Sequence, residues 1–409
     1  MFLKRVCLGI MVCVTMSAAP AQTLLPQGAW NGHLLREDGN IISFHFDIKT
    51  EKGKTLLYII NANEKIRVDK VKNTKDSVVF EMPVFESVFR VKKINGRKWE
   101  GSWTKAGSKK MLVMPFTAEP QLDSHVQPIK PAIADITGKW AVTFTENEPL
   151  YKPGIGEWQQ KGNTLRGTIL TPTGDYRYLT GVISGDSLRL STFDGAHAFL
   201  FIAKIENGQK ISSGIFYSGA TSAQPWIAEK DANAVLPDVA AMFMKDPEEK
   251  LRFRFQDLQK KMVSIEDPKF KNKVVIVQIM GSWCPNCMDE TAFLSEFYAK
   301  YKPKGVEVIG LAYEYSTDFE RAKNSIEKFK KRFKVQYTLL NTGVTSSDSL
   351  RSEKTLPQLT PIKSFPSMII VDRTGRVAKI HTGFEGPGTG LHYDAFKKEF
   401  EATIDKLLK

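Results

Sequence analysis

Short runs in which hydrophobic and polar residues alternate dominate the chain from about residue 22 to residue 230. Residues 42–46, 78–80 and 88–91 are examples, and Gly, Asn and Asp residues separate such runs. Alternation with a period of two, bounded by turn-forming residues, is typical of strands that bury one face. We therefore predict that this half of the chain is built from antiparallel β-strands.

This β region contains an internal repeat, because three short motifs recur at a nearly constant spacing. They are Gly28-Ala29-Trp30 and Gly138-Lys139-Trp140, Asp76-Ser77 and Asp186-Ser187, and Asn95-Gly96 and Asn207-Gly208. We predict two tandem antiparallel β modules, residues 22–118 and 134–230, joined by a Pro-rich linker over residues 119–133. A Gly-x-Trp start followed by a meander is similar to lipocalin-like barrels, but a barrel and a sandwich give the same strand pattern.

The pattern does not by itself assign a task to the β modules. Each module could hold a small ligand, bind a partner protein or mediate self-association. Each could equally act as a spacer without chemistry of its own.

From about residue 235 the pattern changes to alternating strands and helices. Apolar runs predict strands at 274–280, 306–311, 367–371 and 377–380, and helices are predicted from Cys284, over 317–333 and over 392–408. Residues 372–376 suit the turn of a hairpin. This order of elements predicts an α/β domain at the C-terminal end of the chain.

The sequence Cys284-Pro285-Asn286-Cys287 lies between the apolar run 274–280 and a predicted helix. A Cys-x-x-Cys motif between a strand and a helix is typical of redox-active thiols. The N–H groups and the dipole at a helix N-terminus stabilise an anion, so they favour ionisation of the first thiol. Pro285 suits the first helical turn, where its missing N–H has no partner to lose.

The first residues of the chain are typical of a secretory signal peptide. Lys4 and Arg5 precede an apolar stretch at 6–16, and small residues follow it up to Ala21. We predict a signal peptide over residues 1–21, cleaved after Ala21. The mature protein is then exported, periplasmic or otherwise extracytoplasmic, and soluble, because no later apolar run has the length of a membrane span.

The chain has four cysteines, and two of them, Cys7 and Cys13, lie in the predicted signal peptide. Only Cys284 and Cys287 remain after cleavage. An exported protein whose only two remaining cysteines lie in one short motif has no network of structural disulfides. Half of a zinc site is the alternative for this pair, but no second pair completes it. We expect no metal and no other cofactor.

The formal net charge is +13, and basic residues are scattered among acidic ones. The densest basic run, residues 328–334, has the pattern of the polar face of an amphipathic helix. The alternative is a docking surface for an acidic partner or an anionic membrane. We expect no nucleic-acid binding, because export removes the opportunity.

Residues 235–409 resemble the TlpA/ResA-like branch of the extracytoplasmic thioredoxin-fold thiol–disulfide oxidoreductases. The stretches that carry this resemblance are 273–277, 281–287 with Glu290, and 365–375. The resemblance implies a thioredoxin-like fold and thiol–disulfide exchange on protein substrates, with a possible membrane electron donor. It makes Cys284 the attacking thiol and Cys287 the resolving thiol of a redox-active disulfide.

Four further residues are candidates for supporting roles. By the resemblance, Pro366 is a cis-proline that faces the cysteines and exposes the backbone of Phe365 to a substrate strand. Glu290 lies one helical turn after Cys287 and either exchanges a proton with it or is a surface acid like Asp289. Trp283 either flanks the substrate groove or only packs against the domain.

Three functions remain open on the sequence. The leading hypothesis is an exported reductase of protein disulfides, because Asn286 gives the thiolate no positive charge and so does not favour a strong oxidant. The second is a thiol peroxidase, although Gly281 occupies the position where peroxidatic sites have Thr. The third is a cell-envelope binding protein whose β modules capture a ligand or partner.

Overall fold

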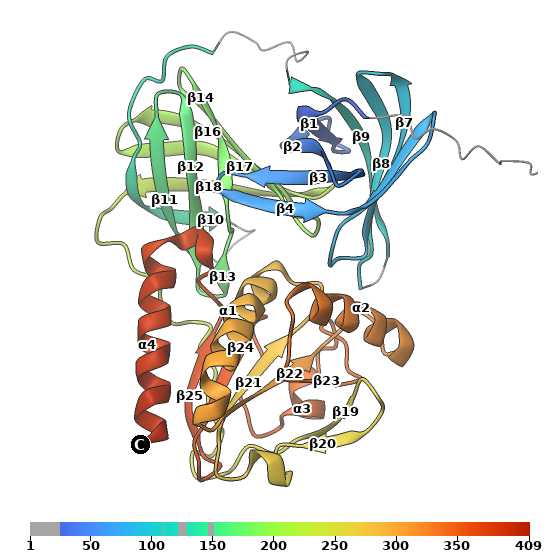
Figure 1. Ribbon diagram of the computed structural model, residues 1–409. Helices are drawn as coiled ribbons and strands as arrows, with labels where there is room; N and C mark the ends of the chain where they lie inside the picture. Colours follow the sequence, from blue (N-terminus) through green and yellow to red (C-terminus); the bar gives the residue numbers. More distant parts are fainter. Residues whose placement is uncertain (1–24, 109, 122–128, 146–150) are drawn as a thin grey trace, which may run out of the picture.

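The computed structural model describes residues 25–108, 110–121, 129–145 and 151–409. The predicted signal peptide, residues 1–21, and residues 122–128 of the predicted linker lie outside the described residues. Two β-barrels lie next to each other at one end of the molecule, and an α/β domain lies against both of them (Figure 1). This architecture confirms the predicted fold class, two antiparallel β modules followed by a thioredoxin-like domain.

The first barrel, barrel 1, is a meander in which each strand pairs with the next, except that β4 does not pair with β5. Its strands are β1 (Gly28–Leu35), β2 (Ile41–Glu51), β3 (Lys54–Asn61), β4 (Glu64–Val68), β5 (Lys70–Asn73), β6 (Ser77–Glu81), β7 (Ser87–Asn95), β8 (Lys98–Lys105) and β9 (Leu112–Pro120). The first strand also pairs with the last, β9. Only Asp69 separates β4 from β5, so the two ends of this sheet are halves of one bent strand and the ring closes.

The second barrel, barrel 2, repeats this plan. Its strands are β10 (Gly138–Thr145), β11 (Tyr151–Lys161), β12 (Thr164–Thr171), β13 (Gly174–Asp175), β14 (Leu179–Ser184), β15 (Ser187–Phe193), β16 (Ala198–Asn207), β17 (Lys210–Ser218) and β18 (Ser222–Lys230). Strand β10 pairs with both β11 and β18, and β11 pairs with β12. These pairings decide between barrel and sandwich, because a closed ring leaves no free sheet edge.

The repeated motifs make the same contacts in both barrels. The indole of Trp30 donates a hydrogen bond to the carbonyl of Pro26 (3.2 Å), and that of Trp140 donates to Ile136 (2.9 Å). The Asn-Gly motifs are equivalent too, since Asn95 and Asn207 each accept from a backbone N–H two residues later, at 2.8 Å. The sequence repeat is therefore a repeat of structure.

The α/β domain is built on a seven-stranded mixed sheet. Its elements are β19 (Arg254–Asp257), β20 (Met262–Ser264), β21 (Val274–Met280), α1 (Pro285–Tyr301), β22 (Val306–Ala312), α2 (Phe319–Arg332), β23 (Thr338–Asn341), α3 (Arg351–Thr355), β24 (Ser367–Val371), β25 (Val377–Thr382) and α4 (Leu391–Leu408). Strand β21 runs parallel to β22 and antiparallel to β24. The predicted helices over 317–333 and 392–408 are observed as α2 and α4.

Strand β21 is buried on both faces, which explains its continuous apolar sequence. Its even-numbered apolar residues pack in a core that includes side chains of α1, α2 and α4. Its odd-numbered residues pack in a second core, which includes Leu356, Leu359 and Ile362. A strand held on both faces in this way fixes the position of the residues that follow it, and these are the Cys-x-x-Cys motif.

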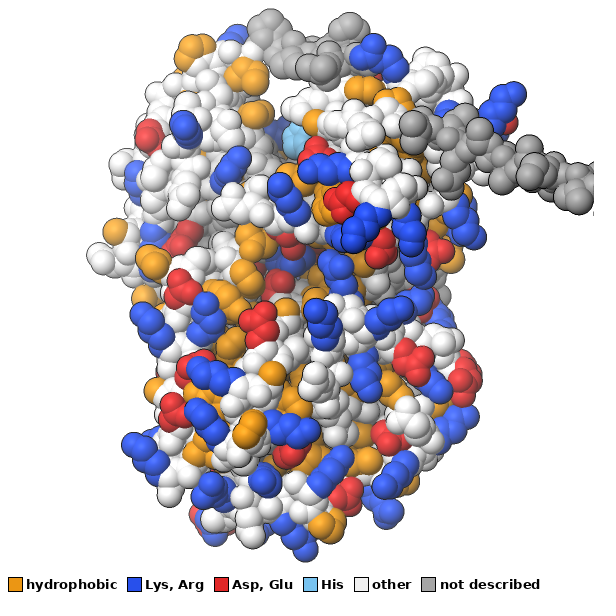
Figure 2. Space-filling view, viewed as in Figure 1, with side chains coloured by type: hydrophobic (Ala, Val, Ile, Leu, Met, Phe, Trp, Pro, Cys, Tyr) orange, Lys and Arg blue, Asp and Glu red, His pale blue; other side chains and the backbone are white. Residues whose placement is uncertain are grey.

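Charged side chains are spread over the visible face, with acidic and basic groups intermixed (Figure 2). The basic run 328–334 lies in α2 and just after it, where Lys330, Lys331 and Lys334 are exposed. Among the described residues, no helix is long and apolar enough to span a membrane.

Candidate active site

Cys284 lies at the N-terminal end of α1, directly after the buried strand β21. It is the N-cap residue of the helix, and its sulfur accepts a hydrogen bond from the N–H of Cys287 (3.4 Å). Both cysteines are free thiols. The turn before them needs glycine, because a Cβ at Gly281 would lie 2.2 Å from the indole nitrogen of Trp283. The helix N-terminus thus fixes the sulfur of Cys284 against the backbone N–H of Cys287.

The two thiols differ in their surroundings. Cys284 lines a cavity between the α/β domain and the barrels, whereas Cys287 is fully buried behind it. Burial, followed by the neighbouring Cys284, raises the pKa of the Cys287 thiol. Cys284 is itself only 5% exposed, so the pair has one thiol at the wall of a cavity and one that is fully shielded and holds its proton.

Residues far along the chain complete the surroundings of Cys284. Its thiol donates a hydrogen bond to the carbonyl of Phe365 (3.3 Å), and the peptide bond between Phe365 and Pro366 is cis. Trp283 donates from its indole to the carbonyl of Tyr313 (2.8 Å) and stacks on Tyr315, with ring centroids 5.0 Å apart. Trp283, Pro285 and Phe365 line the cavity beside Cys284.

Glu290 is fully buried and is not a surface acid. One oxygen, Oε2, accepts a hydrogen bond from the amide of Gln278 (2.8 Å), and the other, Oε1, has no hydrogen-bond partner among the described residues. Desolvation raises the pKa of Glu290 to about 8. The carboxyl group lies close enough to Cys287 for their charges to interact.

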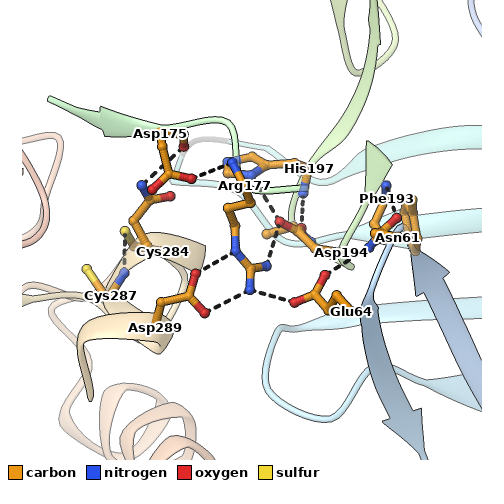
Figure 3. A network of polar contacts seen from close by, with 12 residues as sticks. Asn61, Glu64, Asp175, Arg177, Phe193, Asp194, His197, Cys284, Cys287 and Asp289 are labelled. Atoms are coloured by element: carbon orange, nitrogen blue, oxygen red, sulfur yellow. Dashed lines mark hydrogen bonds and ion pairs between the residues drawn. The ribbon is translucent and has the colours of Figure 1, made fainter. Parts of the chain in front are cut away.

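Asp289, the neighbour of Glu290, points instead toward barrel 2. Its two oxygens accept hydrogen bonds from Arg177, at 2.8 Å from Nε and 2.9 Å from Nη2 (Figure 3). The same guanidinium group bonds Glu64 of barrel 1 (2.7 Å) and Asp194 of barrel 2 (3.3 Å). One buried arginine thus links both barrels to the helix that begins at the cysteines.

A second contact covers the motif itself. The side-chain amide of Asn286 donates to the backbone carbonyl of Asp175 (3.1 Å). The Asp175 carboxylate accepts from the backbone N–H groups of Arg177 (2.5 Å) and Gly386 (2.8 Å). Burial raises the pKa of Asp175 to about 7. Barrel 2 therefore contacts Asn286, one of the two residues between the cysteines.

The cavity beside Cys284 has a volume of about 340 Å³ and is made by all three parts of the molecule. Barrel 1 contributes Lys105, barrel 2 contributes the turn around Gly174 together with His197 and Phe199, and the α/β domain contributes the thiol and its aromatic neighbours. This volume is in the range of small-ligand sites.

The structure brings the two cysteines and the predicted supporting residues together at one site, but sequence reasoning did not single out Lys105, Asp175 and Arg177. Arg177 lies between two tyrosines in the β region, and its backbone φ of 57° is unusual for a residue other than glycine. Neither its burial nor its conformation leaves a local signal in the sequence. Its acidic partners are in other elements.

Comparison with known proteins identifies the C-terminal part of the chain. Residues 232–395 match the Redoxin family. The chain is 27% identical over 126 residues to the thiol–disulfide oxidoreductase ResA of Bacillus thuringiensis subsp. konkukian. The aligned residues are 31% of this chain and 62% of that protein. It is 36% identical over 83 residues to ResA of Bacillus thuringiensis strain Al Hakam, covering 20% of this chain and 46% of that protein.

Among solved structures, the chain is similar to the thioredoxin domain of a thiol–disulfide oxidoreductase from Bacteroides vulgatus. The match covers 39% of this chain and 98% of that domain, with 22% sequence identity and a TM-score of 0.28. The chain spans less than two thirds of the length of the curated relatives named above. The barrels lie outside the matched region. Residues 232–395 are thus a redoxin domain, and the ResA thiol–disulfide oxidoreductases are its distant homologues.

Proposed function

We propose that the protein is a thiol–disulfide oxidoreductase that works through Cys284 and Cys287. The observation that carries this proposal is the asymmetry of the two thiols, since Cys284 lines a cavity at a helix N-terminus and Cys287 is buried behind it. Exchange needs one thiol that ionises and attacks the substrate, and a second thiol that later attacks the mixed disulfide. The match to the Redoxin family supports the same activity.

In the proposed reaction, the Cys284 thiolate attacks one sulfur of a substrate disulfide and forms a mixed disulfide. The other substrate sulfur leaves as a thiolate and takes up a proton. Cys287 then loses its proton, attacks the sulfur of Cys284 and releases the second substrate thiol. Two electrons and two protons pass from the protein to the substrate, and a Cys284–Cys287 disulfide remains.

Glu290 is the proposed acceptor of the Cys287 proton. Its carboxyl group has one oxygen without a hydrogen-bond partner among the described residues and a pKa raised to about 8 by burial. A general base works best when its pKa is near the operating pH. Pro366, Phe365, Pro285 and Trp283 form the proposed surroundings in which the substrate strand lies against Cys284.

The proposed direction is reduction of protein disulfides, since neither residue of the motif between the cysteines carries a positive charge. Lys105, which lines the cavity beside Cys284, acts in the opposite sense, so the reduction potential decides the direction. We further propose export through the predicted signal peptide and reduction of the protein by a membrane electron donor. The equilibrium with glutathione tests the direction. A reduction potential of roughly −270 mV supports a reductant, and a value of about −120 mV contradicts it.

Replacing Cys284 tests the activity itself. Cys284→Ser should abolish reduction of insulin disulfides, and Cys287→Ser should accumulate the mixed disulfide because the resolving thiol is missing. Glu290→Gln should slow the release of the substrate from the mixed disulfide most strongly around pH 8. Full insulin reduction by Cys284→Ser would refute the proposed function.

A further inference from the structure

The cavity beside Cys284 contains a cation that the α/β domain does not supply. Lys105 lies at the end of β8 in barrel 1 and lines the same cavity as Cys284. Its ammonium group donates one hydrogen bond, to the carbonyl of Ala196 in barrel 2 (2.5 Å). Within the described residues, no carboxylate lies in ion-pair range of this group.

The nearby acidic groups are already engaged. Oxygen Oδ1 of Asp194 accepts from the backbone N–H groups of Ala196 (2.9 Å) and His197 (2.7 Å), and Oδ2 binds Arg177 and the His197 ring. Each oxygen of Asp175, the acid that lines the cavity, accepts a backbone N–H. An ammonium group has three N–H donors, so Lys105 retains donors for a further partner.

The surroundings of Lys105 also favour an anion. Desolvation lowers the pKa of the Lys105 ammonium group, while Asp194 and the Cys284 thiolate oppose this effect. A poorly hydrated cation gains more from a carboxylate than an exposed one does, because water no longer screens the interaction. The other cavity walls near the thiol are aromatic, among them Trp283, Tyr315 and Phe365.

We infer that this cavity selects cysteine-containing peptide segments that carry a carboxylate beside the sulfur under attack, and that Lys105 is the residue that recognises this carboxylate. The inference rests on the proposed exchange at Cys284 and adds its substrate class. A cavity of about 340 Å³ is the size of a small-ligand site, so it takes the residues directly beside the attacked cysteine. Barrel 1 then acts as part of the substrate site.

Three peptide disulfides test the inference. Each carries the same chromogenic thiol on one cysteine, and they differ only in whether Glu, Gln or Lys precedes that cysteine. The wild-type protein in its dithiol form should act on the Glu peptide with a kcat/KM about tenfold above that for the Lys peptide, as a charge-assisted hydrogen bond implies. This preference should shrink as salt is added.

Lys105→Met should reduce the Glu-over-Lys preference to about twofold, and Lys105→Arg should keep it. Lys92→Met removes an exposed lysine of the same barrel away from the cavity and should leave the preference unchanged. A full preference in Lys105→Met, or one that does not respond to salt in the wild type, would overturn the inference.

The outcomes separate the inference from the proposed function. Equal rates on all three peptides, lost in Cys284→Ser, would overturn the inference and leave the proposed function standing. No exchange with any peptide by the wild type would refute the proposed function, and the inference would fall with it.

Discussion

The two barrels share their internal landmarks but differ in how they meet the redoxin domain. Both keep the Trp–carbonyl hydrogen bond at the first strand and the Asn-Gly turn near the end of the repeat. Barrel 2 reaches the active-site helix through Arg177, whose side chain is only 4% exposed. Barrel 1 reaches α2 through an ion pair of Glu86 with Arg321, whose side chains are 36% and 46% exposed.

Barrel 2 also holds barrel 1. The ring of Phe193 from barrel 2 stacks on Phe44 in the core of barrel 1, with centroids 4.4 Å apart. The side chain of Asn61 in barrel 1 bonds both the N–H (3.2 Å) and the carbonyl (2.8 Å) of Phe193. The repeat thus preserves what closes each barrel, while Asn61, Phe193 and Arg177 connect the three parts of the molecule.

The largest effect should come from Arg177→Met. The variant leaves three carboxylates without their cation, and these side chains are 2% exposed in Asp194, 14% in Asp289 and 15% in Glu64. Breaking a buried ion pair by removing one partner costs about 4 kcal/mol. We expect a much lower urea midpoint and new proteolytic cleavage between residues 231 and 253, the connection from barrel 2 to the α/β domain.

Arg177→Lys is the matched control, because it keeps the charge but cannot bind two carboxylates as a fork. Its urea midpoint should lie between those of the wild type and Arg177→Met. If Arg177→Met unfolds at the wild-type urea concentration, the buried network does not hold barrel 2 in place.

A second, smaller effect should appear as a dependence on pH. Glu314 lies at the junction with barrel 1 and accepts hydrogen bonds from the N–H (2.9 Å) and hydroxyl (2.7 Å) of Ser282. Burial raises its pKa from 4.5 to about 7. A raised carboxyl pKa means that the folded state binds the proton more tightly, so the stabilisation is complete below about pH 4.5 and is lost as the pH rises to about 7.

Glu314→Gln removes the ionisation and can keep both contacts with Ser282. At pH 8 we expect the variant to be more stable than the wild type by about 3 kcal/mol, and at pH 4.5 we expect nearly equal stability. Urea unfolding at the two pH values measures this. Glu353→Gln, at an exposed site on α3, is the control and should show no such gain; an equal gain there would argue against burial as the cause.

The sequence was most informative about local features with a strong pattern. The seven residues of β21 are apolar because both faces are buried, and the predicted bounds agree with the observed strand. The Cys-x-x-Cys motif spans four adjacent residues and was visible for the same reason. Strand β23 was missed, because its four residues carry only two large apolar side chains.

What the sequence could not give depends on distant partners. Closure of barrel 2 rests on pairing of β11 with β12 and of β10 with β18, and a strand pattern does not reveal this register. Arg177 meets Asp289 and Glu64 at separations of 112 and 113 residues. Its role follows from burial among acids of three elements, and no local pattern records such burial.

The smallest effect should come from Arg321→Met at the barrel 1 junction. Both partners of the Glu86–Arg321 pair are more than a third exposed, and an exposed ion pair contributes at most about 1 kcal/mol. Glu86 also keeps its hydrogen bond from the hydroxyl of Ser325 (3.0 Å). We expect a small shift of the urea midpoint that becomes smaller still at high salt, and no new cleavage between residues 231 and 253. A shift as large as that of Arg177→Met would mean that the exposed ion pair stabilises the molecule as much as the buried network does, and the contrast between the two would then have no energetic meaning.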